Sequence, residues 1–205
     1  MGITVVDHPL VASLLAALRN ETTPPPLFRV LAKRLAVVLT VEATRDLPTR
    51  TVRIRAPLGV TEGAAIATTV VAVPILRAGL GMLEAVTELL PDVSVGYIGL
   101  ERDHATFTPS SYYTKLPDLT GARVLLLDPM LATGGSAAAA CRALLAGNPD
   151  HISLLSIVAA PQGVERLVSE HPDVSIFTAA VDEGLDARAY IRPGLGDFGD
   201  RLYGT

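Results

Sequence analysis

Short apolar runs alternate with longer amphipathic segments from residue 70 to residue 181. The runs are typical of strands buried on both faces, and they cover Val70–Ile75, Val93–Leu100, Arg123–Leu127, Ile152–Val158 and Val174–Val181. We expect helices between them at Gly79–Leu90, from about residue 136 to Leu145, and over 161–170. Because strands that alternate with helices pair in parallel, the pattern predicts an α/β fold with a mainly parallel sheet flanked by helices.

The first 60 residues do not follow this alternation. Residues 7–19 predict a helix, and Thr22–Pro26 predicts the start of a second one, with a threonine cap before prolines whose missing amide donors cost little. From Phe28 to Leu39, apolar residues at spacings of three and four indicate a long amphipathic helix. Residues 41–60 switch to extended patterning and predict a protruding β-arm. The length of 205 residues fits a single domain.

The composition excludes several classes of protein. With 49% apolar and 19% charged residues, the chain is not disordered, and a net charge of −4 argues against nucleic-acid binding by phosphate neutralisation. The only cysteine, Cys141, permits neither an intrachain disulfide nor a cysteine-based metal cluster, and we expect it to fill space on a helix face. The N-terminus lacks a signal-peptide pattern, and the longest apolar run, Ala64–Leu76, is too short to cross a membrane. We therefore expect a soluble cytoplasmic protein without membrane or nucleic-acid partners.

The segment at residues 124–137, VLLLDPMLATGGSA, carries the clearest chemical pattern. An apolar strand runs into Asp128, whose carboxylate can accept hydrogen bonds from sugar hydroxyls. The Thr-Gly-Gly-Ser sequence at 133–136 then opens a helix, where glycines allow close backbone approach and the helix N-terminus favours an anion. A ribose-phosphate suits this arrangement. Taken alone, an ordinary strand–turn–helix junction explains these residues equally well.

Other polar or glycine-rich segments leave the ends of predicted strands. These segments are Pro74–Gly81, a polar loop over 101–118 and Tyr190–Gly199. Arg77 and Arg102 offer guanidinium groups for an anion, although a turn-capping or surface arginine explains each one alone. Asp197 and Phe198 could bond and stack a flat ring. Because ligands of such sheets bind beyond the carboxyl ends of the strands, we expect these segments to converge on one crevice.

Taken together, the segments resemble the uracil phosphoribosyltransferase family. DPMLATGGS at 128–136 is similar to the family's phosphoribosyl-pyrophosphate loop, in which Pro129 replaces the usual second acidic residue. VPILRAGLGM at 73–82 resembles its pyrophosphate-binding loop, and YIRPGLGDFGDRLYGT at 190–205 resembles its uracil-binding loop and terminal signature. The resemblance spans nearly the whole chain. It implies the type I phosphoribosyltransferase fold, with a small hood made of the N- and C-terminal segments.

The resemblance implies roles for individual residues. Catalytic roles fall to Arg77, Arg102, Asp128 and Asp197. The residues implied to bind phosphoribosyl pyrophosphate are Arg77, Arg102, Asp128, Pro129, Met130, Leu131, Ala132, Thr133, Gly134, Gly135, Ser136 and Asp197. Those implied to bind uracil, with backbone groups of Ile191, Gly196 and Phe198 reading its polar edge, are Met130, Ala132, Tyr190, Ile191, Gly196, Asp197 and Phe198.

The implied reaction transfers the 5-phosphoribosyl group to N1 of uracil, which gives UMP and pyrophosphate in pyrimidine salvage. The family uses Mg²⁺, which would be held mainly through the substrate, so we assign no protein metal ligands. The histidines show no ligand spacing, and only His104 lies near the expected site. We expect residues 101–115 to close over the site and exclude water. The resemblance also implies a homodimer or higher homo-oligomer and possible activation by GTP.

The sequence departs from the family pattern in three places. Glu101 stands where the family usually has tyrosine, Ser110 and Ser111 interrupt a proline-containing motif, and Arg192 replaces an apolar residue. We expect Arg192 to point outward. Three alternatives remain: a purine phosphoribosyltransferase, disfavoured by Asp128–Pro129; an RNA-binding regulator, disfavoured by the acidic charge balance; and a ligand-sensing homologue with weak activity.

Overall fold

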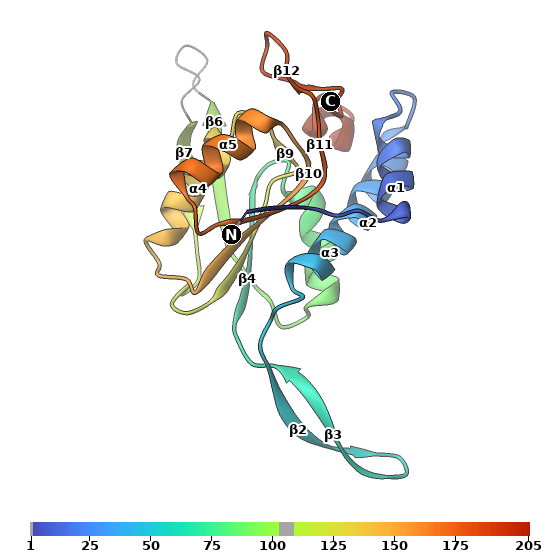
Figure 1. The fold of residues 1–205 in the computed structure, drawn as a ribbon, viewed down its shortest axis with the longest axis vertical. Coiled ribbons are helices and arrows are strands. Elements are labelled where there is room, and N and C mark those ends of the chain that lie inside the picture. The colour runs from blue at the N-terminus through green and yellow to red at the C-terminus, as the bar shows by residue number, and fades with distance from the viewer. Residues whose placement is uncertain (1, 103–108) are drawn as a thin grey trace.

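A computed structural model describes residues 2–102 and 109–205, and it consists of a central sheet between two groups of helices (Figure 1). In spatial order, the strands are β1 (Ile3–Val5), β11 (Ser175–Val181), β10 (His151–Ala159), β8 (Arg123–Leu127), β4 (Val70–Leu76), β6 (Tyr97–Arg102) and β7 (Pro109–Lys115), with β5 (Ser94–Val95) beside β4 and β9 (Met130–Leu131) beside β10. Among the described residues, only β6 and β7 of this sheet pair antiparallel. The predicted α/β fold with a mainly parallel sheet is confirmed.

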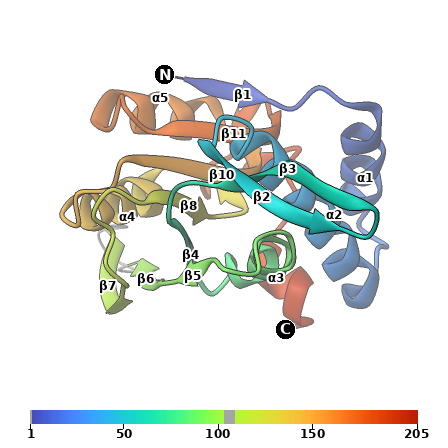
Figure 2. The same ribbon diagram turned by 90° about the horizontal axis from the view of Figure 1, so that it is seen from below.

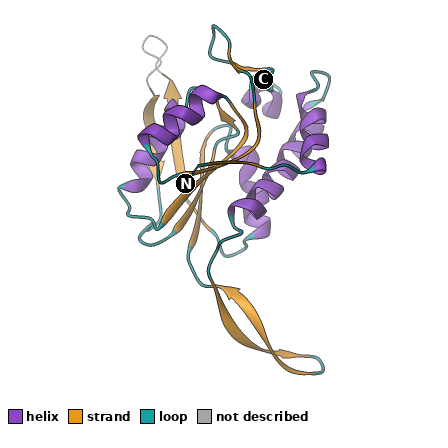
Figure 3. Ribbon diagram, in the orientation of Figure 1, coloured by secondary structure: helices purple, strands orange, loops and turns teal. Residues whose placement is uncertain are grey.

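Helices cover both faces of the sheet (Figure 3). α1 (Pro9–Arg19), α2 (Pro25–Ala43) and α3 (Leu80–Leu89) lie on one face, α4 (Gly135–Leu145) and α5 (Pro161–Glu170) lie on the other, and the short α6 (Phe198–Tyr203) packs against α2. Each face of the sheet forms its own hydrophobic core with the helices that cover it. Along β8, Leu125 and Leu127 belong to the core under α1, α2 and α3, whereas Val124 and Leu126 belong to the core under α4 and α5. Burial on both faces explains why the strand is apolar at successive positions. None of the helices in the described ranges is both long and apolar enough to cross a membrane.

The start of α2 differs from the prediction. The helix begins at Pro25 with Pro24 in the capping position, and no side chain caps it. Thr23 instead donates its hydroxyl hydrogen bond to the carbonyl of Ala17, at 2.7 Å. The predicted threonine cap was wrong. The three consecutive prolines at 24–26 have no backbone N–H groups, so the first positions of the helix offer a threonine side chain nothing to bind.

The protruding arm is present, but its boundaries are shifted. It is an antiparallel hairpin of β2 (Thr49–Ala56) and β3 (Gly59–Ile66), rather than residues 41–60. Residues 41–43 belong to α2, whose buried face continues through Thr40 and Ala43. Figure 1 shows the arm extending away from the sheet, at the opposite end of the molecule from β12 and α6. In Figure 2, seen from below, the arm lies in front of the sheet.

The expected polar loop over 101–118 is largely a strand pair. β7 pairs antiparallel with β6 at the edge of the sheet, where the run Tyr112–Thr114 consists of residues that favour strands. The expected single strand Val93–Leu100 is divided at Gly96 into β5 and β6. Residues 103–108, including His104, lie outside the described residues, so the expected closure of this segment stays a prediction.

Cys141 fills space on the buried face of α4, as expected, and it is fully buried. Burial raises the pKa of its thiol to about 12. The reactive species of a cysteine is the thiolate, so at pH 8 roughly one thiol in ten thousand would be in the reactive form. We predict that a thiol reagent at pH 8 leaves the folded protein unmodified and labels it in denaturing urea. Rapid stoichiometric labelling of the folded protein would contradict this placement.

Candidate active site

A cavity of about 450 Å³ lies beyond the carboxyl ends of β4 and β8. It is lined by residues from several segments that are far apart in the sequence: 75–78, Leu100, Asp128, 130–132, 134–137, 188–191 and 196–199. This is the position at which parallel α/β sheets bind their ligands. The predicted convergence on one crevice therefore agrees with the structure for Pro74–Gly81, residues 128–136 and Tyr190–Gly199, and it stays a prediction for the polar loop over 101–118.

The turn from β4 into α3 places Arg77 at this cavity. Gly79 donates its backbone hydrogen bond to the carbonyl of Ile75, at 2.9 Å. A Cβ on Gly79 would lie 2.4 Å from the carbonyl oxygen of Leu127, so only glycine permits the turn to approach the end of β8 so closely. The approach brings the exposed Arg77 to the same cavity as Asp128, the residue after β8.

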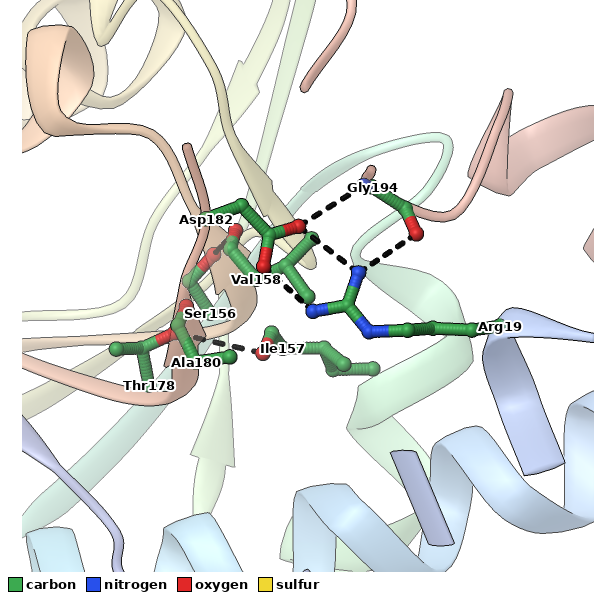
Figure 4. A network of polar contacts seen from close by, with 8 residues as sticks. All are labelled: Arg19, Ser156, Ile157, Val158, Thr178, Ala180, Asp182 and Gly194. Atoms are coloured by element: carbon green, nitrogen blue, oxygen red, sulfur yellow. Dashed lines mark hydrogen bonds and ion pairs between the residues drawn. The ribbon is translucent and has the colours of Figure 1, made fainter. Parts of the chain in front are cut away.

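The loop after β8 is fixed from beneath by a buried hydroxyl. Asp128 itself is half-buried and donates its backbone hydrogen bond to the carbonyl of Leu155, at 3.1 Å. Farther along, the backbone N–H of Leu131 donates to Oγ of Ser156, at 3.1 Å, and that hydroxyl donates to the carbonyl of Val158, at 3.0 Å. Figure 4 shows Ser156 and Val158 side by side. Ser156 thus holds the loop in place without lining the cavity, and the sequence patterns did not identify it.

The N-terminus of α4 lies along the cavity. Its capping residue, Gly134, has φ of +75°, and a Cβ there would lie 2.9 Å from the carbonyl oxygen of Gly163. No side chain caps the helix, and residues 134–137 all line the cavity. Uncapped N–H groups at a helix N-terminus bind anions, so this wall suits a phosphate group.

A C-terminal hairpin forms another wall. β12 (Gly184–Leu185) pairs with β13 (Ile191–Arg192), and Oδ1 of Asp186 accepts hydrogen bonds from the backbone N–H groups of Arg188, at 2.8 Å, and Tyr190, at 2.9 Å. These backbone hydrogen bonds hold the pKa of Asp186 below its usual value. Sequence reasoning missed Arg188 and Ala189, which also line the cavity. An aspartate can accept a hydrogen bond from the backbone N–H two residues on, so Asp186 is a turn signal that could have marked this segment.

The end of the C-terminal loop begins α6. Asp197 caps this helix, with Oδ1 accepting the backbone hydrogen bond of Asp200 at 3.0 Å. Phe198 is only 2% exposed, and its ring packs edge-on against Phe28, with a centroid distance of 5.1 Å. The expectation that this ring stacks on a flat ligand is therefore corrected, because the ring is held in the core. A backbone contact from Phe198 stays a prediction.

Most of the predicted site residues come together. Those that line the cavity are Arg77, Asp128, Met130, Leu131, Ala132, Gly134, Gly135, Ser136, Tyr190, Ile191, Gly196, Asp197 and Phe198. Pro129 and Thr133 belong to the same loop without lining the cavity, and the Pro129 carbonyl accepts backbone hydrogen bonds from β10. Arg102 ends β6, the strand next to β4. Arg192 is exposed, as expected.

The chemistry of the cavity is compatible with a metal held mainly by a substrate. In the part of the chain that the structure describes, no group of three or more histidine, cysteine or acidic residues could hold a metal ion. The cavity nevertheless includes two carboxylate residues, Asp128 and Asp197. Mg²⁺ commonly binds through one or two carboxylates, several waters and substrate phosphates, so these residues fit it.

Comparisons with known proteins agree on one family. A family model described as uracil phosphoribosyltransferase matches residues 5–205. A uracil phosphoribosyltransferase of Dictyoglomus turgidum is 49% identical over 205 residues, which cover 99% of each chain. Another, of Kocuria rhizophila, is 49% identical over 209 residues, which cover all of this chain and 99% of the relative.

Solved structures support the fold. A protein structure from Aquifex aeolicus superposes with a TM-score of 0.95 at 37% identity, covering 99% of this chain and 98% of that one. A hypoxanthine-guanine phosphoribosyltransferase from Bacillus anthracis superposes with a TM-score of 0.54 at 9% identity, covering 77% of this chain and 80% of that one. The latter likeness concerns the fold alone.

Replacing Ser156 by alanine tests the support of the loop. We predict that Ser156→Ala lowers the free energy of unfolding by about 1–3 kcal/mol, because the buried N–H of Leu131 loses its acceptor. Urea denaturation measures this loss, and the exposed Ser169→Ala on α5 is the control. Equal stability of the two variants would show that the Ser156 hydroxyl does not support the loop.

Proposed function

The chain belongs to the uracil phosphoribosyltransferase family, and we propose that it transfers the 5-phosphoribosyl group of phosphoribosyl pyrophosphate to N1 of uracil. The products are UMP and pyrophosphate, a step of pyrimidine salvage. The observation that carries this proposal is the single cavity in which Arg77, Asp128, the N-terminus of α4 and the C-terminal hairpin meet. One wall suits a sugar phosphate, and the other offers a loop for a small flat base.

The donor wall consists of Arg77, Asp128 and residues 134–137. It binds phosphoribosyl pyrophosphate and stabilises the charge that develops during the reaction. The backbone at 134–137 holds the 5′-phosphate, and Asp128 accepts hydrogen bonds from the ribose hydroxyls. As the bond from C1′ to pyrophosphate breaks, positive charge develops on the sugar and negative charge on the leaving group. Arg77, and Arg102 from β6, offset the charge of the leaving pyrophosphate. Most of the rate enhancement then comes from orientation and electrostatics rather than from a protein nucleophile.

The acceptor wall, formed by residues 188–191 and 196–199, positions the base. Backbone groups of Ile191, Gly196 and Phe198 read the polar edge of uracil, and the side chains of Met130 and Tyr190 bound the pocket. In this proposal Asp197 contacts both base and donor. A site built from fixed backbone donors and acceptors rejects cytosine, because exchanging the carbonyl for an amino group leaves buried groups unpaired.

Further properties are part of the same proposal. When bound through the pyrophosphate, Mg²⁺ supplies additional charge stabilisation, and Asp128 and Asp197 are the residues that would hold it or its waters. We also propose, from the family resemblance, a homodimer or higher homo-oligomer, a cytoplasmic location and possible activation by GTP. Pro129 and Thr133 act as parts of the phosphate-binding loop. Residues 101–115 close over the bound substrates.

An assay of UMP formation tests the proposed function. Purified protein incubated with labelled uracil, phosphoribosyl pyrophosphate and Mg²⁺ is expected to form UMP. We predict that Asp128→Asn lowers kcat/KM by about 10²-fold or more, because a preorganised charged contact to the reacting sugar is lost. Asp118→Asn, an aspartate in the loop before β8, is the control and is expected to keep full activity. Product formed from hypoxanthine but not uracil would favour a purine enzyme, and no product at all would favour a ligand-sensing homologue.

Arg188, on the C-terminal hairpin, provides a separate test of donor binding. It is exposed, lines the cavity and adds a second guanidinium to that of Arg77. We predict that Arg188→Gln raises the KM for phosphoribosyl pyrophosphate about tenfold, the loss typical of one charge-assisted hydrogen bond, and leaves the KM for uracil nearly unchanged. Arg192→Gln, on the same hairpin but outside the cavity, is the matched control. Equal donor KM values for the two variants would exclude this contact.

A further inference from the structure

The loop between β13 and α6 is held from behind the cavity by a partly buried ion pair. Arg19, the last residue of α1, donates through Nη1 to Oδ2 of Asp182, at 2.9 Å, and through Nη2 to Oδ1, at 2.5 Å. Nη1 of Arg19 also donates to the carbonyl of Gly194, at 2.8 Å, while the N–H of Gly194 donates to Oδ2 of Asp182, at 2.9 Å. Figure 4 shows the three residues in contact. One ion pair therefore satisfies both backbone groups of Gly194.

The ion pair is largely shielded from water and lies at a tight turn, so its geometry is restricted. The Asp182 side chain is 5% exposed and that of Arg19 is 24% exposed. Gly194 is buried with φ of +57°, and a Cβ there would lie 2.1 Å from the carbonyl oxygen of Ile191, so the turn is tight. Bidentate pairs of arginine and carboxylate fix direction as well as distance, and most of this one is shielded from water.

A second arginine holds the next residue of the loop. Arg201 of α6 donates through Nη1 to the carbonyl of Leu195, at 3.0 Å, and through Nη2 to the carbonyl of Asn20, at 2.6 Å. Its guanidinium lies over the ring of Phe28, 4.5 Å from the centroid. Gly194 is thus bonded directly to the end of α1, and Leu195 is connected to it through Arg201.

The tied residues lie between the backbone groups that the proposed function assigns to uracil. Ile191 precedes Gly194 by three positions, and Gly196 follows it by two. Neither Arg19 nor Asp182 lines the cavity. Recognition by backbone groups requires that the backbone be held to within a fraction of an ångström, and the glycines of this segment would otherwise make it flexible.

We propose that Arg19 and Asp182 are positioning residues for the base: their ion pair sets the conformation of residues 191–196 and thereby the affinity and selectivity for uracil. This inference rests on the proposed function. The pair acts on the acceptor wall alone, since the donor wall is supported separately by β8, α4 and Ser156. A weakened pair therefore changes the use of uracil more than the use of phosphoribosyl pyrophosphate.

Steady-state kinetics of Arg19→Gln and Arg19→Lys test the proposal. A displaced contact can cost up to about 10²-fold in catalysis, so we expect Arg19→Gln to raise the KM for uracil at least about tenfold and to increase the use of cytosine relative to uracil. The KM for phosphoribosyl pyrophosphate should stay within about twofold. Arg19→Lys should recover part of the loss, because an ammonium can pair with Asp182 but lacks the planar fork.

Arg29→Gln is the matched control. Arg29 lies on the neighbouring helix α2 and donates to the carbonyl of Leu202, at 2.8 Å, so its loss removes a similar bond that does not reach the loop. This variant is expected to keep both KM values. If Arg19→Gln and Arg29→Gln change the two KM values alike, or if Arg19→Gln lowers only Tm, the positioning role is overturned.

Hydrogen exchange gives a readout that does not depend on activity. We expect the backbone N–H groups of residues 191–196 other than Pro193 to exchange faster in Arg19→Gln than in the wild-type protein or in Arg29→Gln. Unchanged exchange in this segment would overturn the inference by itself. A wild-type protein that forms no UMP would refute the proposed function, and the exchange comparison would still show whether Arg19 fixes the loop.

Discussion

The burial of β8 on both faces is the constraint on which the site depends. Its side chains from Val124 to Leu127 are at most 2% exposed and alternate between two cores, so neither shift nor rotation of the strand is tolerated. Asp128 follows directly and takes its position from this packing. Gly79 brings Arg77 toward the same strand end, because its missing side chain lets the turn approach the carbonyl of Leu127. The rigid strand therefore places the carboxylate and the guanidinium at one cavity.

The two walls of the cavity are supported by different physical means. The donor wall uses sheet pairing, a glycine turn and the buried hydroxyl of Ser156, all close in space to β8 and β10. The acceptor wall is a short hairpin and loop with little regular structure, and side chains hold it: Asp186 within the hairpin, and Arg19, Asp182 and Arg201 behind it. Precise backbone geometry is thus obtained in a segment whose own hydrogen bonds would not supply it.

The sequence predicted those features that depend on local patterns. β8 was predicted with its observed bounds, and α5 likewise, because an uninterrupted apolar run and a helical period are local signals. The arm was placed too early because residues 41–43 continue the buried face of α2. β7 was taken for a polar loop because its sequence, PSSYYTK, has no apolar run. For the site, glycines and charged residues in strand-end turns were found, whereas Ser156 and Arg19 were missed. A serine inside an apolar strand and an arginine at a helix end have no local signature, and their roles arise only from the packing of β10 and α1 against the site.

The contacts from α1 to the loop between β13 and α6 connect this helix to one wall of the cavity. Arg19 contacts Gly194 directly, and the carbonyl of Asn20 is joined to Leu195 through Arg201, although most of the chain separates α1 from this loop. The loop and α6 are anchored to the core through Phe28, which contacts both the ring of Phe198 and the guanidinium of Arg201. Movement of α1 relative to the sheet would therefore be transmitted to the acceptor wall, while the donor wall, fixed by the sheet, would stay in place. A loop held by a few side-chain contacts opens at lower free energy than a buried strand, so residues 191–196 can open without loosening the loop after β8.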